Sequence, residues 1–157
     1  MSYYFVDRIL EVEKNKSIRA EKGLSLTEDY LQDHFPQYPV MPGVLMMESL
    51  LQAARWLIWY SQDFRPLIIV LDEVRQLKFG KFVRPGRKLG VEVNWKEQSD
   101  GKISFSGQGK IDGETAINCR FSVRVIERES IPRAQKDNEG ELKEKYRQDF
   151  EQLARKN

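Results

Sequence analysis

The chain has 157 residues, 40% of them hydrophobic and 32% charged, which is the balance of one ordinary domain with a buried core. Its 26 basic and 24 acidic side chains nearly cancel, so the charge gives no support to a general nucleic-acid or membrane-surface binder. The single cysteine excludes an internal disulfide and offers no cysteine-based metal site.

The N-terminal residues do not resemble a secretion signal. Residues 2–10 read SYYFVDRIL, with charges where a signal peptide needs an uninterrupted apolar core. The longest apolar stretch, 44–60, is interrupted by Glu48, Gln52 and Arg55, so we expect no membrane span. We therefore expect a cytoplasmic protein.

Residues 41–62 are the strongest helix signal in the chain. Pro42 suits the first helical turn, where its missing N–H group costs nothing, and Gly43 follows it. The run beyond is apolar nearly all round, which predicts a buried helix rather than a surface one.

Segments typical of β-strands lie around this helix. Two of the gaps between them contain Asp-Gly, the strongest short signal for a hairpin turn. One early buried helix followed by a meander of long antiparallel strands predicts an α+β fold, in which a sheet curls round a helix. The predicted strands are 17–24, 66–79, 89–98, 102–111 and 114–126, with hairpin turns at 99–101 and 112–113.

The composition changes near position 131. The remaining residues are rich in charges of both signs, with Leu142, Tyr146, Phe150 and Leu153 at spacings of four, four and three. This pattern predicts a solvated helix with one weak apolar stripe. We expect a main domain at 1–130 and a charged helical tail at 131–157, packed loosely on it or against a partner.

A polar stripe interrupts the buried helix. At about 100° per residue, Glu48, Gln52 and Arg55 fall within about 60° of one another. Such a stripe is either a slot of solvent exposure or the wall of a polar pocket.

The loop before the helix contains His34, the only histidine of the chain. A lone histidine is more often structural than catalytic. Here three prolines at 36–42 stiffen the loop and hold His34 near the helix start. Free N–H groups at that start, beginning with Gly43, can stabilise an oxyanion, and Glu48 can act as an acid. This set suits removal of a proton α to a carbonyl and expulsion of a group at the β carbon.

The segment HFPQYPVMPGVLMMESLLQAA resembles the active-site segment of the 3-hydroxyacyl-acyl-carrier-protein dehydratases, the FabZ-like branch of the hotdog-fold superfamily. The His-Phe-Pro, the Pro-Val-Met-Pro-Gly-Val-Leu, the Glu and the Gln all fall at that family's spacings. YFVDRILEVE and LDEVRQLKFGKFVRPGRKLGVEV extend the resemblance to about residues 3–127. It implies a single hotdog fold and dimers that join two sheets edge to edge, with a trimer of dimers as a further option.

The resemblance also implies roles for single residues. His34 of one subunit takes the α proton, and Glu48 of the other assists departure of the 3-hydroxyl group as water. The carbonyl of Val40 orients His34, and the amide of Gly43 polarises the thioester oxygen. A glutamate at this place favours simple dehydration over dehydration with isomerisation. No cofactor is implied, because the phosphopantetheine arm of acyl carrier protein carries the substrate.

An acyl tunnel is implied beside these groups, lined by Phe35, Pro42, Gln52 and Arg55. Arg55 stands where the family usually has a small residue. It could narrow the tunnel, serve the dimer interface, pair with Glu48 or Asp33, or reach solvent. We expect it to limit the tunnel, and the acyl chain length stays open.

Residues 78–88 carry basic side chains and no acid. They form either a solvated turn or a docking patch for acyl carrier protein, an acidic partner. The basic residues are Lys78, Lys81, Arg84, Arg87 and Lys88.

We therefore expect a dehydratase that converts 3-hydroxyacyl thioesters into trans-2-enoyl thioesters in fatty-acid or related acyl or polyketide synthesis. The alternatives are a hotdog acyl thioesterase and a non-catalytic hotdog protein that binds an acyl carrier or scaffolds a synthase. Asp72 and Glu73 are adjacent acids, but no second histidine exists to complete a site, and we expect no metal. No nucleic-acid partner is expected.

Overall fold

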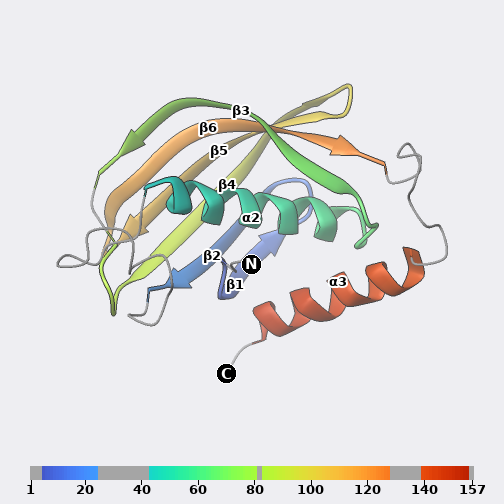
Figure 1. Cartoon of the computed structure of the whole chain (residues 1–157), viewed down its shortest axis with the longest axis horizontal. Coiled ribbons are helices and arrows are strands. Elements are labelled where there is room, and N and C mark those ends of the chain that lie inside the picture. The colour runs from blue at the N-terminus through green and yellow to red at the C-terminus, as the bar shows by residue number, and fades with distance from the viewer. Residues whose placement is uncertain (1–4, 25–42, 81–82, 128–138, 156–157) are drawn as a thin grey trace.

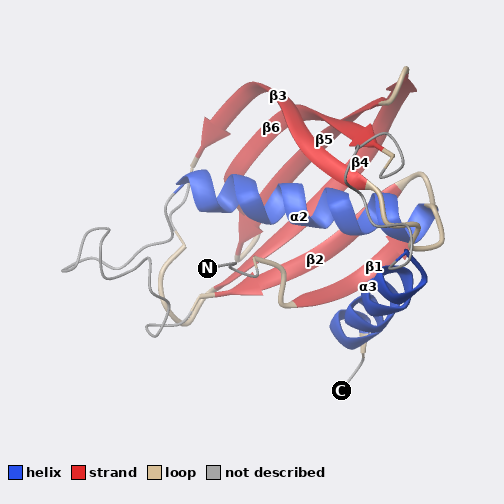
Figure 2. Cartoon of the chain, turned by 45° about the vertical axis from the view of Figure 1, so that its right-hand side comes forward, coloured by secondary structure: helices blue, strands red, loops and turns tan. Residues whose placement is uncertain are grey.

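A computed structural model of the chain describes residues 5–24, 43–80, 83–127 and 139–155. Within these residues one six-stranded antiparallel sheet curls round a central helix, and a second helix lies beside the first (Figure 1, Figure 2). This arrangement confirms the predicted α+β class. The elements are β1 (Arg8–Glu13), β2 (Ser17–Gly23), α2 (Gly43–Ser61), β3 (Ile68–Phe79), β4 (Lys88–Ser99), β5 (Lys102–Ile111), β6 (Glu114–Ile126) and α3 (Glu139–Ala154).

The strands follow the order β1-β2-β4-β5-β6-β3, so β1 and β3 form the two edges of the described sheet. The turns that join β4 to β5 and β5 to β6 were predicted as hairpins, and both are confirmed. Asp100 and Gly101 have φ angles of 50° and 74°, and Asp112 and Gly113 have 50° and 82°. Positive φ at both central residues is what a type I′ hairpin turn requires.

The core lies between α2 and the concave face of the sheet. Leu50, Ala53, Ala54 and Leu57 on α2 are fully buried, which confirms the predicted buried helix. Gly107 on β5 lets the helix come close, because a Cβ atom there would lie 3.2 Å from Cδ1 of Leu50. Burial of a leucine of this kind contributes about 1.5–3 kcal/mol.

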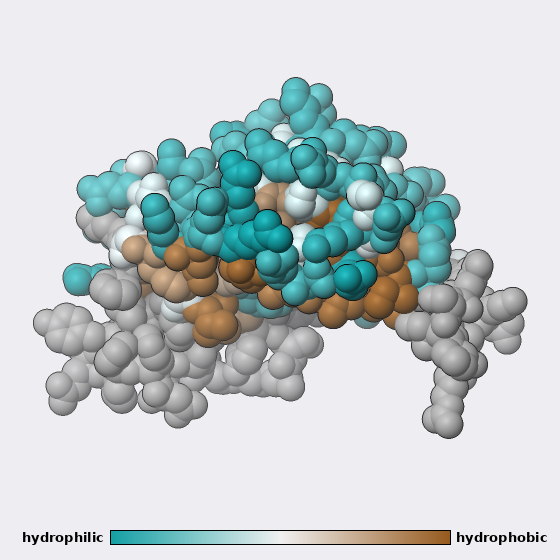
Figure 3. Space-filling model, turned by 90° about the horizontal axis from the view of Figure 1, so that it is seen from above, coloured by the Kyte–Doolittle hydropathy of each residue, from teal (hydrophilic) through white to brown (hydrophobic). Residues whose placement is uncertain are grey.

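The convex face of the sheet is polar. On β5, for example, Ser104 and Ser106 point outward and alternate with buried Ile103 and Phe105. Figure 3 shows hydrophilic side chains over this face and hydrophobic ones gathered along one side of the molecule. The sheet therefore has one face for the helix and one for water, as an antiparallel sheet commonly does.

Helix α3 packs against the main domain of the same chain. Phe150 is only 6% exposed and stacks on Tyr60 of α2 at 5.0 Å between ring centroids. Tyr146 stacks on Trp59 at 4.5 Å. The predicted helix and its apolar stripe are therefore present. The predicted boundary between domain and tail falls within 128–138, outside the described residues, and stays a prediction.

Candidate active site

Helix α2 begins at Gly43, and the aromatic ring of Phe79 lies directly against that residue. A Cβ atom on Gly43 would stand 2.8 Å from Cε1 of Phe79, so no larger residue fits unless the ring moves. The first N–H groups of a helix have no partner within the helix and carry its positive dipole end. The sequence did not predict that Phe79 would lie beside the start of α2; its only signal was an aromatic residue at the end of a strand.

Glu48 lies on the second turn of α2, and its side chain is 34% exposed. Its Oε1 atom accepts a hydrogen bond from Nε2 of Gln52 at 3.4 Å. The same oxygen forms an ion pair with Nη1 of Arg55 at 3.5 Å. The polar stripe predicted from helical spacing is thus a set of three side chains in contact.

Two further elements hold this set in place. The side-chain oxygen of Gln52 accepts a hydrogen bond from the backbone N–H of Phe5 at 2.8 Å. The Nε–H group of Arg55 donates to the backbone oxygen of Ile69 on β3 at 3.2 Å. The Glu48 carboxyl is therefore connected to the N-terminal segment and to the edge strand of the sheet.

Only some of the predicted site residues lie in the part of the chain that the structure describes. Gly43, Glu48, Gln52 and Arg55 lie on one helix, and the last three are in contact. The contact with Glu48 is one of the alternatives considered for Arg55. The other site residues, His34, Phe35, Val40 and Pro42, lie outside the described residues, so their roles stay predictions.

Residues 2–120 match the family of FabA-like domains. The chain belongs to this family. Among curated relatives, the 3-hydroxyacyl-[acyl-carrier-protein] dehydratase FabZ of Dechloromonas aromatica (strain RCB) is 36% identical over 122 residues, 76% of this chain and 85% of the relative. The protein of the same name from Albidiferax ferrireducens is also 36% identical, over 126 residues, 78% of this chain and 84% of the relative.

Solved structures show the same fold. The dehydratase heterocomplex ApeI:P from Xenorhabdus doucetiae has a TM-score of 0.64 at 17% identity, covering 77% of this chain and 82% of its own. Zebra fish thioesterase superfamily member 2 has a TM-score of 0.56 at 11% identity, covering 75% and 79%. The hotdog fold is thereby established. Because a dehydratase and a thioesterase share it, the fold alone does not select a reaction.

The described basic residues of the predicted docking segment are all exposed. Two of them already pair with acids of the same chain: Arg87 with Asp112 at 3.1 Å and Lys88 with Glu21 at 3.6 Å. The segment's charge is therefore partly neutralised, and docking of a carrier protein stays a prediction. The described residues are Lys78, Arg84, Arg87 and Lys88, and Lys81 lies outside the described part.

The adjacent acids Asp72 and Glu73 on β3 pair with cations. Asp72 lies 3.0 Å from Nζ of Lys102 and 2.9 Å from Nε of Arg124, and hydrogen bonds from these two cations lower its pKa. The hydrogen bond from Arg75 lowers the pKa of Glu73 in the same way. The described part of the chain contains no group of three or more His, Cys, Asp or Glu residues that could hold a metal.

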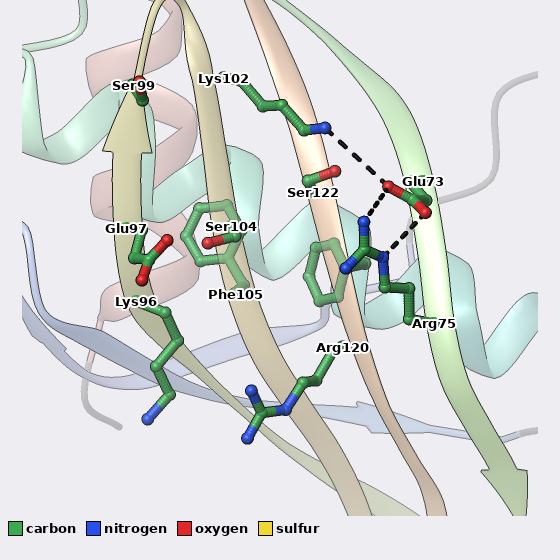
Figure 4. A pocket seen from close by; sticks show the side chains of 11 residues that line it. Glu73, Arg75, Lys96, Glu97, Ser99, Lys102, Ser104, Phe105, Arg120 and Ser122 are labelled. Atoms are coloured by element: carbon green, nitrogen blue, oxygen red, sulfur yellow. Dashed lines mark hydrogen bonds and ion pairs between the residues drawn. The ribbon is translucent and has the colours of Figure 1, made fainter.

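A groove of about 500 Å³ crosses the convex face of the sheet (Figure 4). Glu73 and Arg75 of β3 line one side, Lys96 and Glu97 of β4 the other, and Ser104 lies between them. None of the predicted site residues that the structure describes lines this groove. The carboxyl of Glu48, on the helix, belongs to a different region of the molecule.

Cys119 on β6 is buried in the core. It is 1% exposed, with its Sγ atom 3.5 Å from Sδ of Met47. Burial raises the pKa of the thiol to about 11, so it is not poised to act as a nucleophile. Among the described helices, none has both the length and the apolar character needed to span a bilayer.

Proposed function

We propose that this chain is a 3-hydroxyacyl-[acyl-carrier-protein] dehydratase, which converts 3-hydroxyacyl thioesters into trans-2-enoyl thioesters for fatty-acid or related acyl synthesis. The observation that carries the proposal is Glu48, a partly exposed acid on a central helix that begins at Gly43 and packs into the core. Membership of the FabA-like family and the FabZ relatives support it.

The proposed reaction is an elimination that uses one base and one acid. His34, oriented by the carbonyl of Val40, takes the α proton, and the electron pair of the C–H bond moves toward the thioester carbonyl. The N–H group of Gly43 stabilises the negative charge that develops on the thioester oxygen. As the α–β double bond forms, the β C–O bond breaks and Glu48 protonates the leaving hydroxyl to give water. Each acid–base step of this kind typically contributes ~10²–10⁴ in rate.

This reaction is neither an oxidation nor a reduction, so it requires no redox cofactor, and we propose none. The substrate arrives on the phosphopantetheine arm of acyl carrier protein, the carrier in the FabZ relatives' names. Among the described basic residues of the docking segment, Lys78 and Arg84 have no ion pair with a described acid. These two residues are the best available contacts for an acidic carrier.

We infer a homodimer that forms along β3. Among the described strands β3 pairs only with β6, so its other side faces no described strand. It also carries exposed apolar side chains, which proteins usually cover. Ile69, the β3 residue that binds Arg55, places the Glu48 set near this edge. A second chain on β3 could therefore bring its own His34 to this carboxyl. The exposed apolar residues of β3 are Val70, Leu71, Leu77 and Phe79.

The test is an incubation of the full chain with 3-hydroxyacyl thioesters of acyl carrier protein. Enoyl thioester, free acid and bound carrier are measured in the same samples. We expect enoyl thioester to form. Accumulation of free acid would indicate a thioesterase, and binding without turnover would indicate a carrier-binding protein, and either would refute the proposal.

A further inference from the structure

We propose that Arg55 is a positioning residue that holds the Glu48 carboxyl so that Oε2 is the oxygen presented to the substrate. This inference rests on the proposed function, because it assigns Arg55 a role in the same reaction. Arg55 stands where the resemblance leads us to expect a small residue. The contact by which Arg55 positions Glu48 is therefore a feature of this chain and not of the family pattern.

The two oxygens of Glu48 have different surroundings. Oε1 receives both contacts, one from Nε2 of Gln52 and one from Nη1 of Arg55. Among the described residues, Oε2 makes no hydrogen bond or ion pair. A carboxyl held by one oxygen keeps its other oxygen in a defined direction, available for proton transfer to a leaving hydroxyl.

Arg55 can hold the carboxyl because its guanidinium is itself fixed. Nε donates to the backbone oxygen of Ile69 on β3, while Nη1 faces Glu48. The planar guanidinium group joins these two donors rigidly. Its hydrogen bond to β3 therefore also fixes the position of the Glu48 carboxyl relative to the sheet. The side chain is 29% exposed, which allows the charge to be partly hydrated while its direction is fixed.

The geometry differs from that of a residue that only narrows a tunnel. Arg55 lies seven positions, about two helical turns, after Glu48, and its side chain must extend back along α2 to reach Oε1. The guanidinium is thus directed toward the reacting group. A small residue here would leave Oε1 with Gln52 alone, and a misplaced acid can cost ~10²-fold in rate.

The first test compares Arg55→Gln and Arg55→Lys with the wild-type chain. We expect Arg55→Gln to lower kcat about tenfold while KM for the acyl carrier substrate changes less than about twofold. Arg55→Lys should recover part of kcat, because its Nζ restores a cation but cannot make both contacts. The matched control is Arg19→Gln, which removes an exposed ion pair with Glu11 on other elements and should leave kcat unchanged.

An unchanged kcat in Arg55→Gln would overturn the inference. A shift toward longer acyl chains at unchanged kcat would also overturn it, and would assign Arg55 to the tunnel wall instead. Should Arg55→Gln fail to fold, Arg55→Lys alone still distinguishes the outcomes, because positioning predicts a partial loss of kcat in it.

A second measurement does not depend on activity. Urea unfolding of Glu48→Gln, Arg55→Gln and the double variant gives the coupling between the two side chains. For a partly exposed pair we expect a coupling of about twofold to fivefold in the unfolding equilibrium constant. If the two substitutions change the free energy of unfolding additively, Arg55 and Glu48 do not interact, and the inference is wrong even if the enzyme is active. Coupling without any wild-type turnover would refute the proposed function and leave the contact standing.

Discussion

At the scale of single residues, the start of α2 requires a glycine at position 43, because the ring of Phe79 occupies the space that a side chain would fill. The Phe79 ring stands 2.8 Å from where a Cβ atom of Gly43 would lie. We predict that Gly43→Ala displaces the ring or the first helical turn, costs about 1–3 kcal/mol of stability and lowers turnover. Urea unfolding and enoyl formation measure the two effects.

The control for this substitution is Gly140→Ala on α3, where a Cβ atom meets nothing within 4 Å. It should leave turnover unchanged and should not lower stability, because alanine is favoured over glycine in a helix. If the clash is the cause, adding Phe79→Ala to Gly43→Ala should recover most of the lost stability. A double variant as unstable as Gly43→Ala alone would contradict this explanation.

Cys119 predicts a pH dependence of stability. Burial raises the pKa of its thiol from 9.0 to about 11, so the folded chain holds a proton that the unfolded chain loses. The stabilisation is fully present below pH 9 and is lost as the pH rises from 9 toward 11. The loss is about 2–3 kcal/mol at most.

Other groups titrate in this range, so the test is the difference between wild type and Cys119→Ala. Urea unfolding is measured at about pH 8 and about pH 10.5, which lie below and above the ordinary thiol pKa. The free energy of unfolding should fall less between these two pH values in Cys119→Ala than in the wild type. Equal losses in both proteins would mean that the thiol is not buried in the folded state.

At the scale of elements, the sequence predicted the hairpin turns and helix α2, which depend on neighbouring residues, but not the contacts between distant parts of the chain. The Asp-Gly turns require positive φ, and the hairpins of β4, β5 and β6 follow from them. Helix α2 follows from its apolar run, and contact between Glu48 and Arg55 was one of the options that helical spacing allowed. In contrast, Phe79 reaches Gly43 and Ile69 reaches Arg55 only because the sheet curls round the helix.

The position of β3 at the edge of the sheet shows the same limit. It was predicted as a strand, but its partner β6 lies far along the chain, and strand pairing at that distance leaves little local signal. The register of the pair also shifts twice, and Gln76 has a φ angle of 51°. Such irregularities arise where a strand bends, and the strand sequence did not predict them.

Helix α3 gives a test at this scale. Phe150 fills a space between Trp56, Tyr60 and Phe64, so we predict that Phe150→Ala destabilises the protein by about 3–5 kcal/mol. The control is Gln152→Ala on the exposed side of α3, which should change stability by less than about 0.5 kcal/mol. Urea unfolding followed by tryptophan fluorescence measures both. If Phe150→Ala is no less stable than Gln152→Ala, α3 does not contribute to the core.

At the scale of the whole molecule, the two edges of the sheet make a matched pair. Leu77 on β3 is 42% exposed and Leu10 on β1 is 41% exposed. We predict that Leu77→Lys dissociates the dimer and lowers turnover, because a charge on an edge strand opposes edge-to-edge pairing. Leu10→Lys should do neither. Sedimentation of both variants beside the wild type measures dissociation of the dimer. Dissociation by Leu10→Lys alone would place the interface at β1 and contradict the proposed interface at β3.

The central claim is that Glu48 and the His34 of a second subunit together dehydrate the substrate. The most direct test is enoyl formation by Glu48→Gln and His34→Ala, each alone and then mixed under conditions of subunit exchange. Alone, each should retain less than about a tenth of wild-type turnover, while the control Glu97→Gln on the convex face stays active. Mixed equally, they should regain about a quarter, since half of the dimers then hold one intact site of two. A Glu48→Gln chain that dehydrates at the wild-type rate, or an exchanged mixture that recovers nothing, would contradict the claim.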